Sequence, residues 1–205
     1  VILNADDYAL SQGISTSIVE LLGKRRISGI SAMTASPYWH DHGPWLRPFL
    51  DQADIGLHFT LTEIEPLGPV SSIAAEGKPA NFSDVFRRSI ASRIDAEDIR
   101  RELKRQWEAF RDVLGTQPSH VDGHQHIHQL PVIRDAVIET VASLSPKGGT
   151  YVRACVDRPT AILGRRVGVA RAFALAYFGR EFRLRAKARG VMTNSGFSGL
   201  YDLSG

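Results

Sequence analysis

Three short segments of the chain combine carboxylates and imidazoles, the side chains that bind metal ions and transfer protons. They are Asp6-Asp7, His58 and the nonapeptide HVDGHQHIH at 120–128. Each lies at the carboxyl end of an apolar run that we predict to be a strand. In parallel β/α folds active sites form at that edge of the sheet, because the loops that follow the strands gather there. We therefore expect the three segments to meet in one site.

Geometry limits how many ligands the nonapeptide can supply. An extended strand advances about 3.3 Å per residue, whereas a metal ion lies about 2 Å from its ligands. One ion can therefore bind one or two of these side chains. Gly123 permits a bend where the strand should end, which favours His124. The other ligands must come from different strands, where Asp7 and His58 are available. Two imidazoles, one carboxylate and an open water position are typical of a catalytic metal site.

Each segment by itself has a simpler interpretation. His58 alone would be a buried core residue, Asp6-Asp7 alone a cap or turn, and the histidine-rich nonapeptide an adventitious metal binder. Two adjacent carboxylates that leave a buried strand are costly unless a cation or protons compensate them. Together the three segments therefore favour one divalent ion. A lone cysteine, Cys155, excludes a disulfide framework and a cysteine-rich zinc site, and no G-x-S-x-G or glycine-rich nucleotide motif is present.

The elements that must position these residues alternate between strand and helix. The clearest helix runs from Asp95, its predicted N-cap, to Leu114 before Gly115. The predicted strands cover residues 1–4, 30–35, 54–61, 120–124, 150–154 and 191–194, and further helices begin after Ser11, near Pro131 and at Thr160, the last ending at Phe178. The segment 63–82, rich in Pro and Gly, is long enough for a functional loop.

This alternation predicts a parallel sheet. We expect a single α/β domain over residues 1–205, (β/α) barrel-like, with an open or closed sheet and with fewer than eight regular units allowed. The last block, 196–205, ends without a helix, so the final unit is expected to be truncated at the C-terminus.

The composition is that of an ordinary globular domain, with 43% apolar and 23% charged residues. Without an 18-residue apolar run or a leader segment, a cytoplasmic protein is expected. Residues 147–189 contain eleven Lys and Arg against two acids. A solvated helix face is the simplest interpretation, and the part from 161 to 189 also suits peripheral contact with an anionic membrane. No nucleic-acid partner is expected, and a dimer is compatible with the sequence.

Three motifs in this order resemble the YdjC-like carbohydrate deacetylase family, which includes chito-oligosaccharide deacetylase: NADDYALSQGI at 4–14, GLHFTLT at 56–62 and HVDGHQHIH at 120–128. The closing GFSGLYD at 196–202 resembles the hopanoid-biosynthesis-associated branch. The family usually has Phe-Gly where this chain has Tyr8-Ala9, and its members extend beyond residue 205. The resemblance implies a barrel-like fold and hydrolysis of an N-acetyl group from an amino sugar or glycolipid.

The resemblance also implies roles for single residues. It implies that Asp7, His58 and His124 bind a divalent ion, zinc or magnesium. The resemblance allows magnesium, whereas two imidazoles with one carboxylate suit magnesium less well.

By similarity to the wider polysaccharide deacetylases, Asp6 is the general base. His126 or His128 would protonate the departing amine, Asp122 would orient one of these two imidazoles, and His120 would be structural.

Two alternatives to the deacetylase stay open. A metallo-phosphoesterase or another amidohydrolase could use the same imidazoles and carboxylates, and the basic stretch after Lys147 would suit a phosphorylated substrate. A non-catalytic barrel that binds a glycan, or that docks on a membrane through 161–189, would need no metal for its function. Release of acetate rather than phosphate would distinguish the deacetylase from the phosphoesterase. A function that depends on metal would distinguish either enzyme from the binding module.

Overall fold

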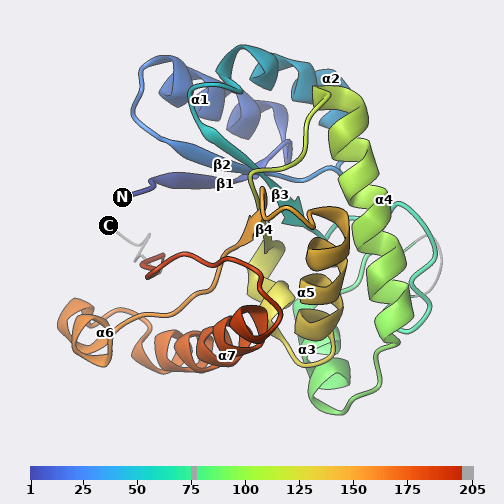
Figure 1. Ribbon diagram of the computed structural model, residues 1–205, viewed down its shortest axis with the longest axis vertical. Helices are drawn as coiled ribbons and strands as arrows, with labels where there is room; N and C mark the ends of the chain where they lie inside the picture. The colour runs from blue at the N-terminus through green and yellow to red at the C-terminus, as the bar shows by residue number, and fades with distance from the viewer. Residues whose placement is uncertain (75–77, 200–205) are drawn as a thin grey trace.

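The computed structural model describes residues 1–74 and 78–199, and it is an α/β fold built on one parallel sheet (Figure 1). The sheet has five strands in the order β1-β2-β3-β4-β5, and every neighbouring pair is parallel. The strands are β1 (Asn4–Tyr8), β2 (Gly29–Ala32), β3 (Asp54–Phe59), β4 (His120–Gly123) and β5 (Tyr151–Val152). This sequential order is that of a (β/α) barrel, and in the described residues the sheet is open. The expected α/β class is confirmed.

The helices from α1 to α5 lie in the connections between strands, and α6 and α7 follow the last strand (Figure 1). They are α1 (Gln12–Gly23), α2 (Trp39–His42), α3 (Phe82–Ile90), α4 (Ala96–Leu114), α5 (Ile133–Leu144), α6 (Pro159–Arg165) and α7 (Val169–Ala188), with two 3₁₀ segments, η1 (Gly43–Phe49) and η2 (His124–Gln129). Among the described residues, none of these helices combines the length and the apolar character that a membrane span requires.

Helix α4 forms as the sequence predicts. The side chain of Asp95 accepts a hydrogen bond from the Glu97 backbone at 2.8 Å, and Gly115 ends the helix at a φ of 73°, a conformation that glycine adopts without strain. The buried side of α4 packs against η1 and α2, where the rings of Trp39 and Phe110 stack at 5.9 Å. Helix α4 also packs against β3, the strand that carries His58.

The strands predicted at 30–35, 54–61 and 150–154 end earlier than expected, at Ala32, Phe59 and Val152. Three other predicted elements differ more. Strand β1 begins at Asn4 instead of residue 1 and contains Asp6 and Asp7, because the site supplies partners for their carboxylates while Val1 to Leu3 stay exposed. The helix predicted over 160–178 is two helices, which separate where Arg166 and Gly168 adopt positive φ. The strand predicted at 191–194 is a single bridge between Val152 and Thr193.

Candidate metal centre and active site

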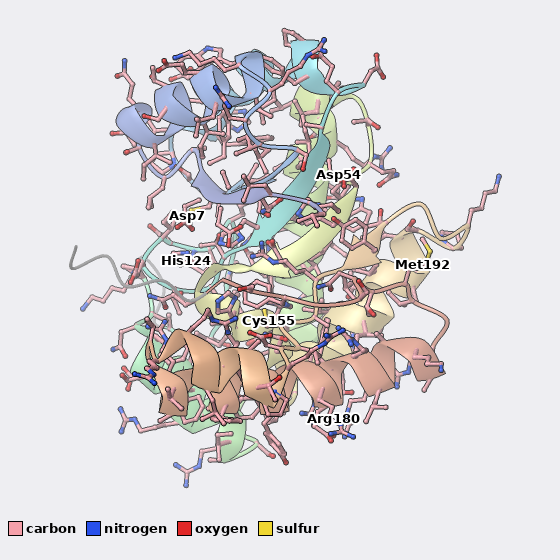
Figure 2. The ribbon with its side chains drawn as sticks, turned by 90° about the vertical axis from the view of Figure 1, so that its left-hand side faces the viewer. Asp7, Asp54, His124, Cys155, Arg180 and Met192 are labelled. Atoms are coloured by element: carbon pink, nitrogen blue, oxygen red, sulfur yellow. The ribbon has the colours of Figure 1, made fainter. Side chains whose placement is uncertain are left out.

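Asp7, His58 and His124 converge at the carboxyl edge of the sheet, as the spacing of the motifs predicts. The Oδ1 atom of Asp7 lies 3.1 Å from His58 Nε2 and 2.8 Å from His124 Nδ1. One ligand atom from each residue lies within 4.8 Å of the other two. Figure 2 shows Asp7 and His124 close together, on the side of the molecule away from Met192. One carboxylate and two imidazoles with a common focus are a donor set that suits a divalent ion of the first transition row.

His58 is fixed in the sheet by a buried carboxylate on the next strand. Its Nδ1 lies 2.6 Å from Asp122 Oδ1, and the two residues are register partners across β3 and β4. Burial by itself would lower the pKa of His58, but the carboxylates of Asp122, Asp7 and Asp6 outweigh it and raise the pKa to about 10. The cluster therefore favours a positive charge at this position, which a proton or a metal ion can provide.

Asp122 thus has a different partner from the one expected. The prediction that it orients His126 or His128 was wrong: its Oδ1 faces His58. Its Oδ2 accepts a hydrogen bond from the Ser31 hydroxyl at 2.6 Å and lies 2.8 Å from the Arg153 guanidinium. The pairing was not readable from the sequence because it depends on the register of two strands that are 64 residues apart.

Asp6 pairs with Arg153. The two guanidinium nitrogens donate to the two oxygens of Asp6 at 2.7 and 2.6 Å, and the Asn4 amide donates to Oδ1 at 2.7 Å. Burial would raise the pKa of Asp6, but Arg153 outweighs it and holds the pKa below its usual range. Asp6 is therefore ionised at neutral pH, as a general base must be. An oxygen of Asp6 also lies within 4.8 Å of a ring nitrogen of His58.

Arg153 was not among the residues predicted for the site. This residue directly follows β5, so its place at the end of a predicted strand was the available signal. Its side chain is buried, and it is the counter-ion of both Asp6 and Asp122.

The two histidines proposed as general acids differ in their surroundings. His128 is buried, its Nε2 donates to the Arg153 carbonyl at 2.7 Å, and its ring meets Phe182 of α7 edge-on. His126 is half-buried, with Nδ1 3.6 Å from Cys155 Sγ and its ring against Phe197. Burial lowers the pKa of His126 to about 3 and that of His128 to about 4, so both imidazoles are neutral at pH 7. Of the two, His126 is the more accessible.

His120 has a structural environment. Its Nε2 lies 3.0 Å from the Ser31 hydroxyl, and its ring stacks on Tyr151 at 5.1 Å. A Cβ atom at Gly56 would come within 2.3 Å of the His120 ring, which explains why the GLHFTLT motif needs glycine at this position.

A fourth carboxylate at the rim of the site was also missed. Glu63 Oε2 lies 3.1 Å from His124 Nε2, and Glu63 Oε1 accepts from the Gln125 amide at 2.6 Å. Glu63 opens the segment 63–82 that the sequence marks as a functional loop, and this position was the available signal. Residues with positive φ gather here, a pattern common at functional sites: Asp7, Ala9, Glu63, Gln125 and His126.

Comparisons with known proteins identify the family. The family described as YdjC-like protein matches residues 1–205. A chitooligosaccharide deacetylase of Enterobacter sp. (strain 638) is 30% identical over 158 residues, which are 77% of this chain and 59% of that protein. The chitooligosaccharide deacetylase of Serratia marcescens is 34% identical over 134 residues, 65% of this chain and 52% of that protein. The chain thus spans less than two thirds of the length of these relatives.

A solved structure shares the fold. It is a protein of Enterococcus faecalis V583 described provisionally as a cellobiose-phosphate cleavage protein, and it superposes with a TM-score of 0.64 over 95% of this chain and 66% of that chain. At 20% sequence identity, this likeness concerns the fold alone.

Proposed function

This chain belongs to the YdjC-like family, and we propose that it is a metal-dependent deacetylase that hydrolyses the N-acetyl group of an amino sugar, in a saccharide or a glycolipid. The observation that carries the proposal is the common focus of Asp7, His58 and His124 beside the ionised carboxylate of Asp6. The relatives named chitooligosaccharide deacetylase support the reaction class.

In this proposal Asp7, His58 and His124 hold one divalent ion. When bound, such an ion polarises the amide carbonyl and lowers the pKa of a coordinated water. Two imidazoles with one carboxylate suit zinc or another first-row ion better than magnesium.

The remaining steps belong to side chains. Asp6 accepts the proton of the attacking water, and Arg153 holds the Asp6 carboxylate by two hydrogen bonds in one orientation. His126, the less buried of the two candidate acids and neutral at pH 7, relays to the departing nitrogen the proton that Asp6 has accepted. The C–N bond breaks, and the products are acetate and the free amine of the sugar.

The phosphoesterase alternative has less support. Among the Lys and Arg side chains of the described residues, Arg153 is the one that contacts the acidic residues of the site. Its charge is already neutralised by Asp6 and Asp122, so it is not free to bind a phosphate group. Most of the basic stretch lies on α6 and α7, and membrane contact through 161–189 stays a prediction.

The test is acetate release from a panel of N-acetylated saccharides and N-acetylglucosaminyl lipids. We expect release that is lost after chelation and restored by a divalent ion. Full activity in chelator-treated protein would contradict the proposal, and so would release of phosphate from sugar phosphates with no release of acetate from any substrate.

A further inference from the structure

The two ring nitrogens of His124 face two different carboxylates. Nδ1 lies 2.8 Å from Asp7 and Nε2 lies 3.1 Å from Glu63. A neutral imidazole carries one N–H and one lone pair, so the partner of one nitrogen determines what the other can do. We propose that Glu63 is a positioning residue for His124: it accepts the Nε2 hydrogen and leaves the Nδ1 lone pair directed at the metal ion.

The same arrangement recurs, with the nitrogens exchanged, at the other imidazole. Asp122 lies 2.6 Å from His58 Nδ1, which leaves Nε2 to face Asp7 at 3.1 Å. Histidines that bind metals commonly donate their second N–H to a carboxylate, which fixes the tautomer and the ring orientation and makes the ligand more basic. Glu63 provides the carboxylate acceptor for His124 that Asp122 provides for His58, although Glu63 lies in a loop.

Glu63 is attached to the molecule at two points besides His124. Its backbone N–H donates to the Ala80 carbonyl at 2.9 Å. Its Oε1 accepts from the Gln125 amide at 2.6 Å, and the Gln125 Oε1 accepts from the Thr62 hydroxyl at 3.0 Å. One carboxylate oxygen is therefore held by Gln125 while the other contacts the imidazole. Glu63 is thus held in place, unlike a surface glutamate that moves freely.

This inference rests on the proposed metal site, so its test measures metal binding directly. The Zn²⁺ affinity of the metal-stripped protein is measured by competition with a chromophoric chelator, for the wild type and four variants. Glu63→Ala removes the acceptor, and Glu63→Gln keeps an uncharged acceptor oxygen. Glu65→Ala removes an exposed glutamate of the same loop. Gln125→Asn shortens the amide side chain that joins the loop to η2, and asparagine tolerates the positive φ at this position.

We expect Glu63→Ala to weaken Zn²⁺ binding by about 10- to 100-fold and Glu63→Gln to weaken it less, because it retains an acceptor. Glu65→Ala should bind Zn²⁺ as the wild type does, and Gln125→Asn should weaken binding less than Glu63→Ala, because it removes an anchor of Glu63 and leaves the acceptor of the His124 hydrogen in place. Thermal unfolding of each metal-free variant confirms that it is folded.

Two results would overturn the positioning role alone. The first is wild-type affinity in Glu63→Ala. The second is an equal loss in Gln125→Asn and Glu63→Ala, because it would show that the contact only holds the loop in place. A wild-type protein that binds no Zn²⁺ would instead remove the metal site of the proposed function, and the role of Glu63 with it.

Discussion

The two imidazoles of the candidate metal centre have the same kind of partner in contrasting surroundings. His58 stands in the sheet, and its carboxylate partner Asp122 is fully buried, with 0% of its surface exposed. His124 stands in η2 after a strand end, and the side chain of its partner Glu63 is 54% exposed. The comparison separates a sheet-held side of the site, around His58, from a loop-held side, around His124.

The two sides should differ in what their charges contribute to stability. Asp122 contacts His58, Ser31 and Arg153, so its removal leaves the buried His58 and Arg153 with one carboxylate partner fewer. Water can replace Glu63, because most of its surroundings are solvent. The sheet-held side is therefore part of the folded core, whereas the loop-held side can be altered at little cost to the fold.

The largest effect on turnover should come from Asp6, the proposed general base on the sheet-held side. Asp6→Asn keeps the shape and the hydrogen bond from Asn4 but cannot accept a proton, so acetate release should fall by about 10²- to 10⁴-fold with the metal still bound. Kinetics and metal content measured on the same sample check this. Loss of the metal instead would mean that Asp6 and Asp7 have been assigned the wrong way round.

The next effect is on stability. Asp122→Ala should lower the free energy of unfolding of the metal-free protein by about 3–5 kcal/mol, because it leaves the Arg153 guanidinium in a buried site with one partner fewer. Urea unfolding measures the change. A loss below about 1 kcal/mol, the size typical of an exposed ion pair, would erase the distinction between the two sides.

The smallest effect, again on the free energy of unfolding, is expected at Glu63, the carboxylate partner of His124. Glu63→Ala should change the free energy of unfolding of the metal-free protein by no more than about 0.5 kcal/mol, even where it weakens metal binding. The same urea experiment applies. A loss as large as that of Asp122→Ala would show that the loop is part of the cooperative core.

The sheet-held and loop-held sides also differ in how far they could be predicted. The meeting of Asp7, His58 and His124 follows from one rule, that strand ends of a parallel sheet share an edge. Helix α4 was predictable for a local reason, since its cap, its apolar stripe and its closing glycine agree. The pairing of Asp122 with His58 could not be predicted, because it arises from the register of two strands.

The loop-held side was harder to predict. Glu63 and Gln125, which contact each other, both adopt positive φ, a conformation that neither residue type favours and that no local sequence pattern predicts. Strand β1 was placed too early because two aspartates read as a turn, whereas in the fold the carboxylate of Asp6 is neutralised by Arg153 from 147 residues away.

The central claim is that one ion joins the two sides, and the metal content of the purified protein tests it most directly. Elemental analysis of the wild type, His58→Ala and His124→Ala, each reloaded with Zn²⁺ and dialysed, should give about one equivalent for the wild type and almost none for either variant, as expected for a centre with three protein ligands. One equivalent retained in both variants would show that the ion binds elsewhere, and would contradict the claim.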